Sequence, residues 1–194
     1  MSTVTNPIRQ AMAGLRILLV MTVLLGVCYP AAVLLIAQAV PAQANGSLVS
    51  ADGRVVGSAL LGQNAPGPQW FQGRPSASDD SGATSGGSNL SPASTAQASA
   101  IEERRQALLA ANPDAVGPPP ADALTASASG LDPDISPAYA RWQVPRVAAA
   151  TGLPAAELEA MIAAATDPAP LGYLGQDGVN VTRLNLALAQ RVGE

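Results

Sequence analysis

The sequence of 194 residues contains no lysine, no histidine and a single cysteine, and all ten of its basic residues are arginine. Without lysine the chain has no Walker A loop, no kinase phosphate-binding lysine and no Schiff base. Without histidine it lacks the usual general base, the Ser-His and Cys-His nucleophile pairs and the commonest zinc ligand. One cysteine forms neither an intrachain disulfide nor a cysteine cluster. The composition therefore argues against an autonomous enzyme, and we predict no catalytic residue and no metal site.

Aromatic residues are also scarce, with two Trp, three Tyr and one Phe. Hydrophobic residues still make up 48% of the chain, so any core is built from Ala, Leu and Val. The net charge of −4 argues against a nucleic-acid binder, which carries a basic face.

One long uncharged segment is present near the N-terminus. No charged residue lies between Arg16 and Asp52, and residues 17–40 within that gap are almost wholly apolar. As a helix these 24 residues measure about 36 Å, enough to cross a hydrocarbon core of roughly 30 Å. We therefore predict a tail over residues 1–16 and a membrane-spanning helix over 17–40. Pro30 is expected to kink this helix, and Tyr29 and Pro30 lie too centrally to be interface anchors, so both are candidates for contact with a partner helix.

A cleaved signal peptide is the alternative, because residues 42–44 (Ala-Gln-Ala) form a fair cleavage site. The apolar stretch is much longer than the usual hydrophobic region of about 7–15 residues, which favours a retained anchor. Arg9 and Arg16 precede the span and only Arg54 follows it closely, which places the N-terminus in the cytoplasm. Residues 41–194 then lie outside the cytoplasm, with eight arginines, 14 acidic residues and a net charge of −6. This acidity serves either to gather cations or to keep the domain soluble.

The exterior part shows signals of both strands and helices. Asp52-Gly53 predicts a β-hairpin over residues 47–63, and residues 76–100, rich in Ser, Gly and Ala, read as a long surface loop or a disordered stretch. Helices are predicted over residues 99–111 from a capping box at Ser99, from Ser136-Pro137 onward, over 144–151 up to Gly152, over 155–165, and at the C-terminus around Val181, Leu184 and Leu188. We therefore expect an α+β fold in which one membrane helix precedes one extracytoplasmic domain with a hairpin and several helices.

Three short motifs are candidates for chemistry. Ser85-Gly86-Gly87-Ser88-Asn89 offers backbone amides for an anion, although Gly-Gly-Ser is also common in linkers. Asp132 and Asp134 are not followed by the Gly and Glu that complete a calcium-binding loop. Roles in turns and helix caps are therefore favoured for both. Trp70 and Phe71 are favoured as buried aromatic residues that pack in the core beside a turn.

Several segments, taken in order, resemble one known family, the C subunit of the bacterial Kdp-type potassium-transporting ATPase (KdpC). The resemblance is carried by residues 57–58 (Gly-Ser), 62–63 (Gly-Gln), 71–76 (Phe-Gln-Gly-Arg-Pro-Ser), 85–90 (Ser-Gly-Gly-Ser-Asn-Leu), 124–127 (Leu-Thr-Ala-Ser), 129–133 (Ser-Gly-Leu-Asp-Pro), 135–137 (Ile-Ser-Pro), 142–147 (Trp-Gln-Val-Pro-Arg-Val), 171–175 (Leu-Gly-Tyr-Leu-Gly), 179–181 (Val-Asn-Val) and 184–185 (Leu-Asn). Their number and order carry the match, and no single piece decides it. The sequence has Gln72 and Asp134 where the family usually shows His, and Ala128 and Tyr173 where it usually has Gly or Phe.

The resemblance implies a non-catalytic subunit of an ATP-driven potassium uptake complex. Its implied partners are a channel-like potassium-translocating subunit, a P-type ATPase subunit and the lipid bilayer, and ATP and potassium are handled through the complex. The family is described as a catalytic chaperone that raises the ATP affinity of the ATPase subunit. Residues 85–89 resemble the ABC-transporter signature and are the nucleotide-site candidates. The partner-contact candidates are Tyr29, Pro30, Trp70, Phe71, Arg74, Asp132 and Asp134.

The predicted topology places this loop and cytoplasmic ATP on opposite sides of the bilayer, so an effect on ATP affinity has to be allosteric. Two rival functions remain. An anchored or secreted hydrolase needs a nucleophile motif, but residues 86–90 (Gly-Gly-Ser-Asn-Leu) lack the closing Gly of G-x-S-x-G. A periplasmic binding or structural module unrelated to transport is the other. Neighbouring genes for a channel-like protein and a P-type ATPase would favour the transport subunit over both.

Overall fold

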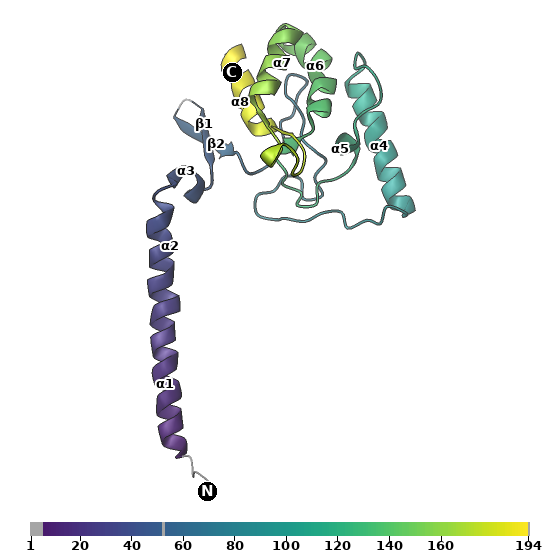
Figure 1. The fold of residues 1–194 in the computed structure, drawn as a ribbon. Coiled ribbons are helices and arrows are strands. Elements are labelled where there is room, and N and C mark those ends of the chain that lie inside the picture. Colours follow the sequence, from purple (N-terminus) through teal and green to yellow (C-terminus); the bar gives the residue numbers. More distant parts are fainter. Residues whose placement is uncertain (1–5, 52, 194) are drawn as a thin grey trace. The chain divides into compact units, whose positions relative to one another are not determined.

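The computed structural model describes residues 6–51 and 53–193 and divides the chain into two compact units, one ending at Ser47 and the other beginning at Leu48. The first unit is helical. α1 (Pro7–Val23), a π-helical turn η1 (Leu24–Cys28) and α2 (Tyr29–Ala37) form one continuous helix, and α3 (Pro41–Ala44) follows (Figure 1). Asn6 caps α1 by accepting the Ile8 amide at 3.1 Å, and Pro7 occupies the first turn, where its missing N–H costs nothing.

The 31-residue helix Pro7–Ala37 is long and apolar enough to cross a membrane, and none of the 18-residue window that meets this test is buried within the protein. It begins ten residues before the predicted span and ends three residues before the predicted limit. Pro30, expected to kink the helix, is preceded by η1, where the Tyr29 amide bonds to the Leu24 carbonyl five residues earlier. This wider turn takes up the strain that a proline ring imposes on the preceding turn. The kink itself stays a prediction.

The second unit is α+β, as predicted. β1 (Leu48–Ala51) and β2 (Arg54–Ser58) form the expected antiparallel hairpin, with an irregularity between Val49 and Ser50. A second sheet was not predicted: β3 (Asp134–Ile135), β5 (Gly178–Asn180) and β4 (Thr166–Asp167) pair antiparallel in the order β3-β5-β4.

The helices confirm most of the sequence signals. α6 (Pro137–Thr151) begins after Ser136, whose hydroxyl accepts the Tyr139 amide at 3.0 Å, and ends at Gly152 in the left-handed region. α7 (Ala155–Ala164) and α8 (Val181–Val192) follow as expected, with the short η2 (Pro170–Gly172) between them. α5 (Ala121–Leu124) was not predicted.

The predicted start of α4 was wrong. α4 (Thr95–Ala111) begins after Ser94, whose hydroxyl accepts the Gln97 amide at 3.1 Å, and not after Ser99. Ser94 and Ser99 each have Gln or Glu three residues later, and three of the four residues between them, Ala96, Gln97 and Ala98, are good helix formers. The helix therefore extends back to the earlier cap. It ends at Ala111, as predicted, with Asn112 as its C-cap.

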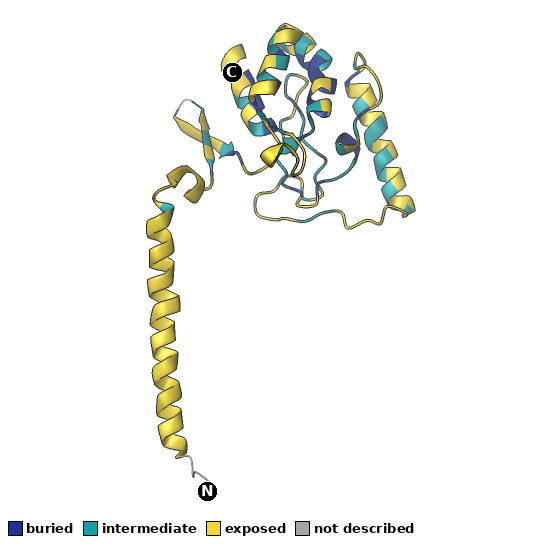
Figure 2. Ribbon diagram, in the orientation of Figure 1, coloured by how far each residue is buried: buried dark blue, intermediate teal, exposed yellow. Residues whose placement is uncertain are grey.

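The core of the second unit lies where α6, α7 and α8 meet the three-stranded sheet. Phe71, from the loop that precedes α4, is fully buried in it together with Leu158, Ile162 and Leu184. Figure 2 shows the buried residues gathered on α5–α8 and the hairpin largely exposed. α4 has no buried residue. The packing prediction for Phe71 is therefore confirmed.

Candidate functional site

The backbone of Phe71 and Gln72 is held on two sides by side-chain amides. Asn185 of α8 accepts from the Phe71 N–H and donates to the Phe71 carbonyl, both at 2.9 Å. Gln143 of α6 accepts from the Gln72 N–H at 2.7 Å and donates to the Gln72 carbonyl at 3.0 Å. Each side-chain amide thus forms with one residue the pair of hydrogen bonds, one donated and one accepted, that a neighbouring strand would form. We call this arrangement the amide clamp; it fixes an irregular segment to the two helices.

Arg146 extends the amide clamp. Its Nη2 donates to Oε1 of Gln143 and its Nε to Oδ1 of Asn112, both at 2.7 Å. Its Nη1 donates to the carbonyls of Pro68 and Trp70. Burial lowers the pKa of this guanidinium. One arginine therefore joins the end of α4, the middle of α6 and the segment before Phe71.

Beyond the clamp, residues 74–87 run along residues 125–132, and we call this region the loop junction. The hydroxyl of Ser76 donates to the Gly130 carbonyl at 2.7 Å and accepts the Asp80 amide at 2.9 Å. Gly130 has φ +67°, and an added Cβ there would lie 2.6 Å from the Gly86 carbonyl oxygen. Of the stretch 76–100, predicted as a surface loop or as disordered, the first part is thus a loop tied by hydrogen bonds to the chain after α5, whereas residues 95–100 belong to α4.

The loop junction also contains an ion pair between two of the predicted site residues. Nη1 of Arg74 lies 3.0 Å from Oδ2 of Asp132, with roughly a quarter of each side chain exposed. The other carboxylate oxygen of Asp132 accepts the Asp134 amide at 3.1 Å, which is an Asx turn. The predicted turn role of Asp132 is therefore confirmed, and both of its oxygens are engaged.

The signature-like residues Ser85–Asn89 lie on the loop junction. The Gly86 amide donates to the Ser129 carbonyl at 2.8 Å, and the Ser85 hydroxyl donates to the same oxygen at 3.0 Å. A Cβ on Gly87 would lie 2.9 Å from the Ala128 carbonyl, so this glycine allows the two loops to approach closely. The Gly86 amide is already used and does not face a ligand. Nucleotide contact at these residues stays a prediction.

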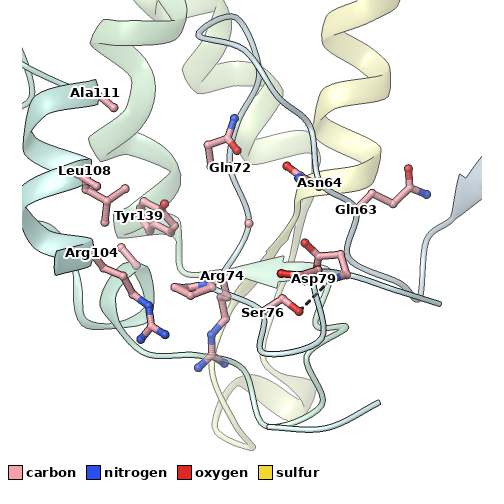
Figure 3. Close-up of a pocket in the computed structure, with 15 residues that line it drawn as sticks. Gln63, Asn64, Gln72, Arg74, Ser76, Asp79, Arg104, Leu108, Ala111 and Tyr139 are labelled. Carbon is pink, nitrogen blue, oxygen red and sulfur yellow. Dashed lines mark hydrogen bonds between the residues drawn. The ribbon is translucent and has the colours of Figure 1, made fainter. Parts of the chain in front are cut away.

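A cavity of about 420 Å³ lies between α4 and the loop that precedes it. Figure 3 shows Arg104, Leu108 and Ala111 of α4 on one side, Gln63, Asn64 and Asp79 on the other, and Tyr139 and Arg74 between them. Tyr139 is almost fully buried, and desolvation raises its pKa to about 12, so its hydroxyl stays protonated at neutral pH. The lining carries both signs of charge, and no group of three metal-ligating side chains comes together in residues 6–51 and 53–193.

Asp134 corrects a prediction. It lies in β3 and not in a turn or cap, and its Oδ1 accepts from Nδ2 of Asn180 at 3.1 Å. That Asn180 nitrogen also donates to the Ala59 carbonyl at 2.9 Å, which ties the sheet to the chain after the hairpin. Desolvation is the main reason why the pKa of Asp134 is raised above its ordinary 3.8, and the negative charges of Asp132 and Asp167 add to it.

The raised pKa of Asp134 gives a pH prediction. The folded state disfavours the charged carboxylate, so its contribution to stability is greatest below pH 3.8 and declines as the pH rises through the window above that value. Asp134→Asn keeps an acceptor for Asn180 and removes the charge. We expect a gain below about 0.5 kcal/mol at pH 7, because the group is partly exposed, and a flatter pH dependence of the free energy of unfolding. Urea unfolding between pH 4 and about pH 7 measures both, and a variant less stable than the parent at pH 7 would show that the charge is favoured.

The remaining site candidates are not brought together. Tyr29 and Pro30 belong to α2 in the first unit and are exposed, whereas Trp70 is half-buried beside the clamp. Sequence reasoning missed the clamping amides, Gln143 and Asn185. Both stand on the core-facing side of their helices, next to Val144 and Leu184, and a polar residue in that position was the available signal.

Comparison with known proteins identifies the family of this chain. The profile of the family described as "KdpC: K+-transporting ATPase, c chain" matches residues 11–190. The potassium-transporting ATPase KdpC subunit of Kineococcus radiotolerans is 53% identical over 186 residues, which is 95% of each chain. That of Sorangium cellulosum is 53% identical over 90% of this chain and 94% of its own. That of Gemmatimonas aurantiaca is 51% identical over 91% and 92%. With these matches covering the helix, the clamp and the loop junction alike, the chain belongs to the KdpC family.

Proposed function

We propose that this chain is the non-catalytic subunit of an ATP-driven potassium uptake complex, which it helps to assemble and in which it raises the ATP affinity of the ATP-hydrolysing subunit. The observation that carries the proposal is the 53% identity to a potassium-transporting ATPase KdpC subunit along 95% of both chains. Its partners are then a channel-like potassium-translocating subunit and a P-type ATPase subunit, with the bilayer around the apolar helix.

The chemistry of the chain supports a non-catalytic role. A P-type ATPase forms its aspartyl phosphate at a D-K-T-G motif, and a sequence without lysine cannot contain one. We expect the purified chain neither to hydrolyse ATP nor to take up ³²P from labelled ATP. Turnover that a substitution within this chain abolishes would contradict the proposal.

The topology follows from the arginines that flank the helix. We propose an inner-membrane protein with its N-terminus in the cytoplasm and residues 41–194 in the periplasm. An alkaline phosphatase fusion after Gly193 is expected to be active and a green fluorescent protein fusion dark, with Met1–Ala44 retained in the mature chain. The opposite reporter pattern would show that the orientation is reversed. A mature N-terminus at Asn45 would show that the apolar helix is cleaved off and is not a retained anchor.

In that topology the nucleotide effect reaches ATP through Pro7–Ala37 and the partner subunits, because the loop junction and ATP are on opposite sides of the bilayer. The test is to purify the complex with and without this chain. We expect the partner subunits to co-purify with it, and the KM for ATP to rise when it is removed from an otherwise assembled complex. An unchanged KM for ATP would contradict the effect on ATP affinity and leave only the role in assembly. Failure to co-purify any membrane partner would contradict the whole proposal.

A further inference from the structure

The β1–β2 hairpin exposes apolar side chains on both of its faces. Val55 and Val56 are adjacent in β2 and therefore point to opposite faces, yet they are 60% and 47% exposed. Leu48 in β1 is 57% exposed, and Leu60, just after the hairpin, is 59% exposed. A soluble surface carries such residues singly, whereas a group of them marks a contact that is missing.

Each face of the hairpin borders a hollow. Leu48, Val55 and Leu61 line one of about 320 Å³, which Asp80 also borders. Val56 and the half-buried Trp70 line another, of about 340 Å³, whose far wall is a mixed face of α8 with Thr182, Asn185, Leu186 and Ala189. Aliphatic side chains beside a Trp are the composition of segments that lie in the boundary between lipid headgroups and acyl chains.

The chain length keeps this hairpin close to the bilayer. Ten residues separate Ala37, the end of the apolar helix, from Leu48, and four of these are helical in α3. Their reach is therefore at most about 30 Å, and a tether of this length holds the hairpin at high effective concentration near the membrane surface.

The distribution of charge along the sequence also favours a contact between the hairpin and the membrane. Residues 48–78 carry two arginines and one acidic residue, a net charge of +1, whereas residues 79–194 carry six arginines and 13 acidic residues, a net charge of −7. An anionic lipid surface attracts the first segment and repels the second.

We propose that the hairpin is a second membrane contact of this protein: its apolar side chains, with Trp70, lie in the interfacial layer of the bilayer and bind phospholipid acyl chains. Arg54, at the start of β2, then meets lipid phosphates. This contact limits how the domain can move relative to the membrane, whereas the apolar helix alone only keeps it nearby. The proposal rests on membrane anchoring by Pro7–Ala37, but neither on the side of the membrane nor on potassium transport.

The test uses the full chain with Cys28→Ala, which removes the only cysteine. Val55→Cys carries a nitroxide spin label, and Val116→Cys, at a site 91% exposed in the loop after α4, is the matched control. The labelled chains are reconstituted in vesicles of phosphatidylethanolamine and phosphatidylglycerol, alone and with the partner subunits. We expect the ratio of oxygen to water-soluble nickel-chelate accessibility to be several-fold higher at position 55 than at position 116 in both preparations.

Equal ratios in vesicles that carry the chain would overturn the proposal while leaving the proposed function intact. A high ratio that falls only when the partner subunits are present would overturn it in favour of a protein partner. A chain that does not float with the vesicles would overturn the anchor and this contact together.

A second measurement needs no cysteine variant. Phospholipids brominated on the acyl chains quench tryptophan only at short range, and the chain has two tryptophans, of which Trp142 is buried in the core. We expect strong quenching in the parent chain and none in Trp70→Phe. Val55→Asp should reduce the quenching in the parent background, whereas Val116→Asp should leave it unchanged. Unquenched emission from the parent chain would reject the lipid contact.

Discussion

Gln143→Leu is expected to lower the free energy of unfolding by about 3–5 kcal/mol, because it leaves three polar groups without their partner. Gln143 is fully buried, and its amide serves the Gln72 N–H, the Gln72 carbonyl and the Arg146 guanidinium. Leucine fills a similar volume, so the loss comes from unsatisfied groups and not from a cavity. For a domain of ordinary stability this is a large fraction of the total.

Urea unfolding of the full chain in detergent, followed by tryptophan fluorescence, measures the change as a midpoint shift on the order of 2 M. The control is Gln106→Leu on the exposed face of α4, where the amide has only Glu102 as partner; a change within about 0.5 kcal/mol is expected there. Gln143→Glu should fall between the two, since it keeps the acceptor for Arg146 and loses the donor to Gln72. Equal midpoints for the two leucine variants would show that the clamp adds nothing to stability.

Gly130→Ala is expected to cost about 3 kcal/mol, from two separable causes. The left-handed backbone at φ +67° costs an alanine roughly 1–2 kcal/mol. The new Cβ also meets the Ser78 hydroxyl and lies 2.6 Å from the Gly86 carbonyl, so the two sides of the loop junction must move apart.

Gly152→Ala isolates the first cause, because Gly152 has φ +73° and nothing lies within 4 Å of an added Cβ. We expect this control to lose only about 1–2 kcal/mol, the backbone cost alone. Limited proteolysis supplies a second readout, since Gly130→Ala should speed cleavage within residues 78–88 while Gly152→Ala should not. If both variants lose the same stability and are cleaved at the same rate, the close approach at Gly130 is not tight.

Local sequence signals identified the elements that are determined by residues adjacent in the sequence. Asp52-Gly53 predicted the hairpin, Ser136-Pro137 the start of α6, and Gly152 its end. The three-stranded sheet had no such signal, because strands of two or three residues show no periodicity. They are strands because β5 pairs with two segments distant in the sequence, through Asp134 with Asn180 and through Thr166 with Val179.

The same limit applies to the candidate site. A buried aromatic at Phe71 was predictable, since it depends on the residue alone. The roles of Gln143 and Asn185 depend on which backbone groups the fold places against them, and a polar residue among apolar neighbours does not name that partner. Asp134 illustrates the reverse case, where a residue typical of turns is placed in a strand by Asn180, a partner 46 residues away in the sequence.

The π-helical turn before Pro30 also affects how a neighbouring helix can pack on the apolar helix Pro7–Ala37. A turn that holds one extra residue sets every later side chain back by about 100° around the axis relative to a regular helix. Side chains spaced by seven along α1 therefore fall out of phase with those along α2, and Gly26 lies at the discontinuity. A straight partner helix that follows one stripe before Leu24 meets a different stripe after Cys28. Tryptophan scanning of Pro7–Ala37 in the assembled complex should accordingly give two periodic patterns of sensitivity, offset at the π turn, in place of one.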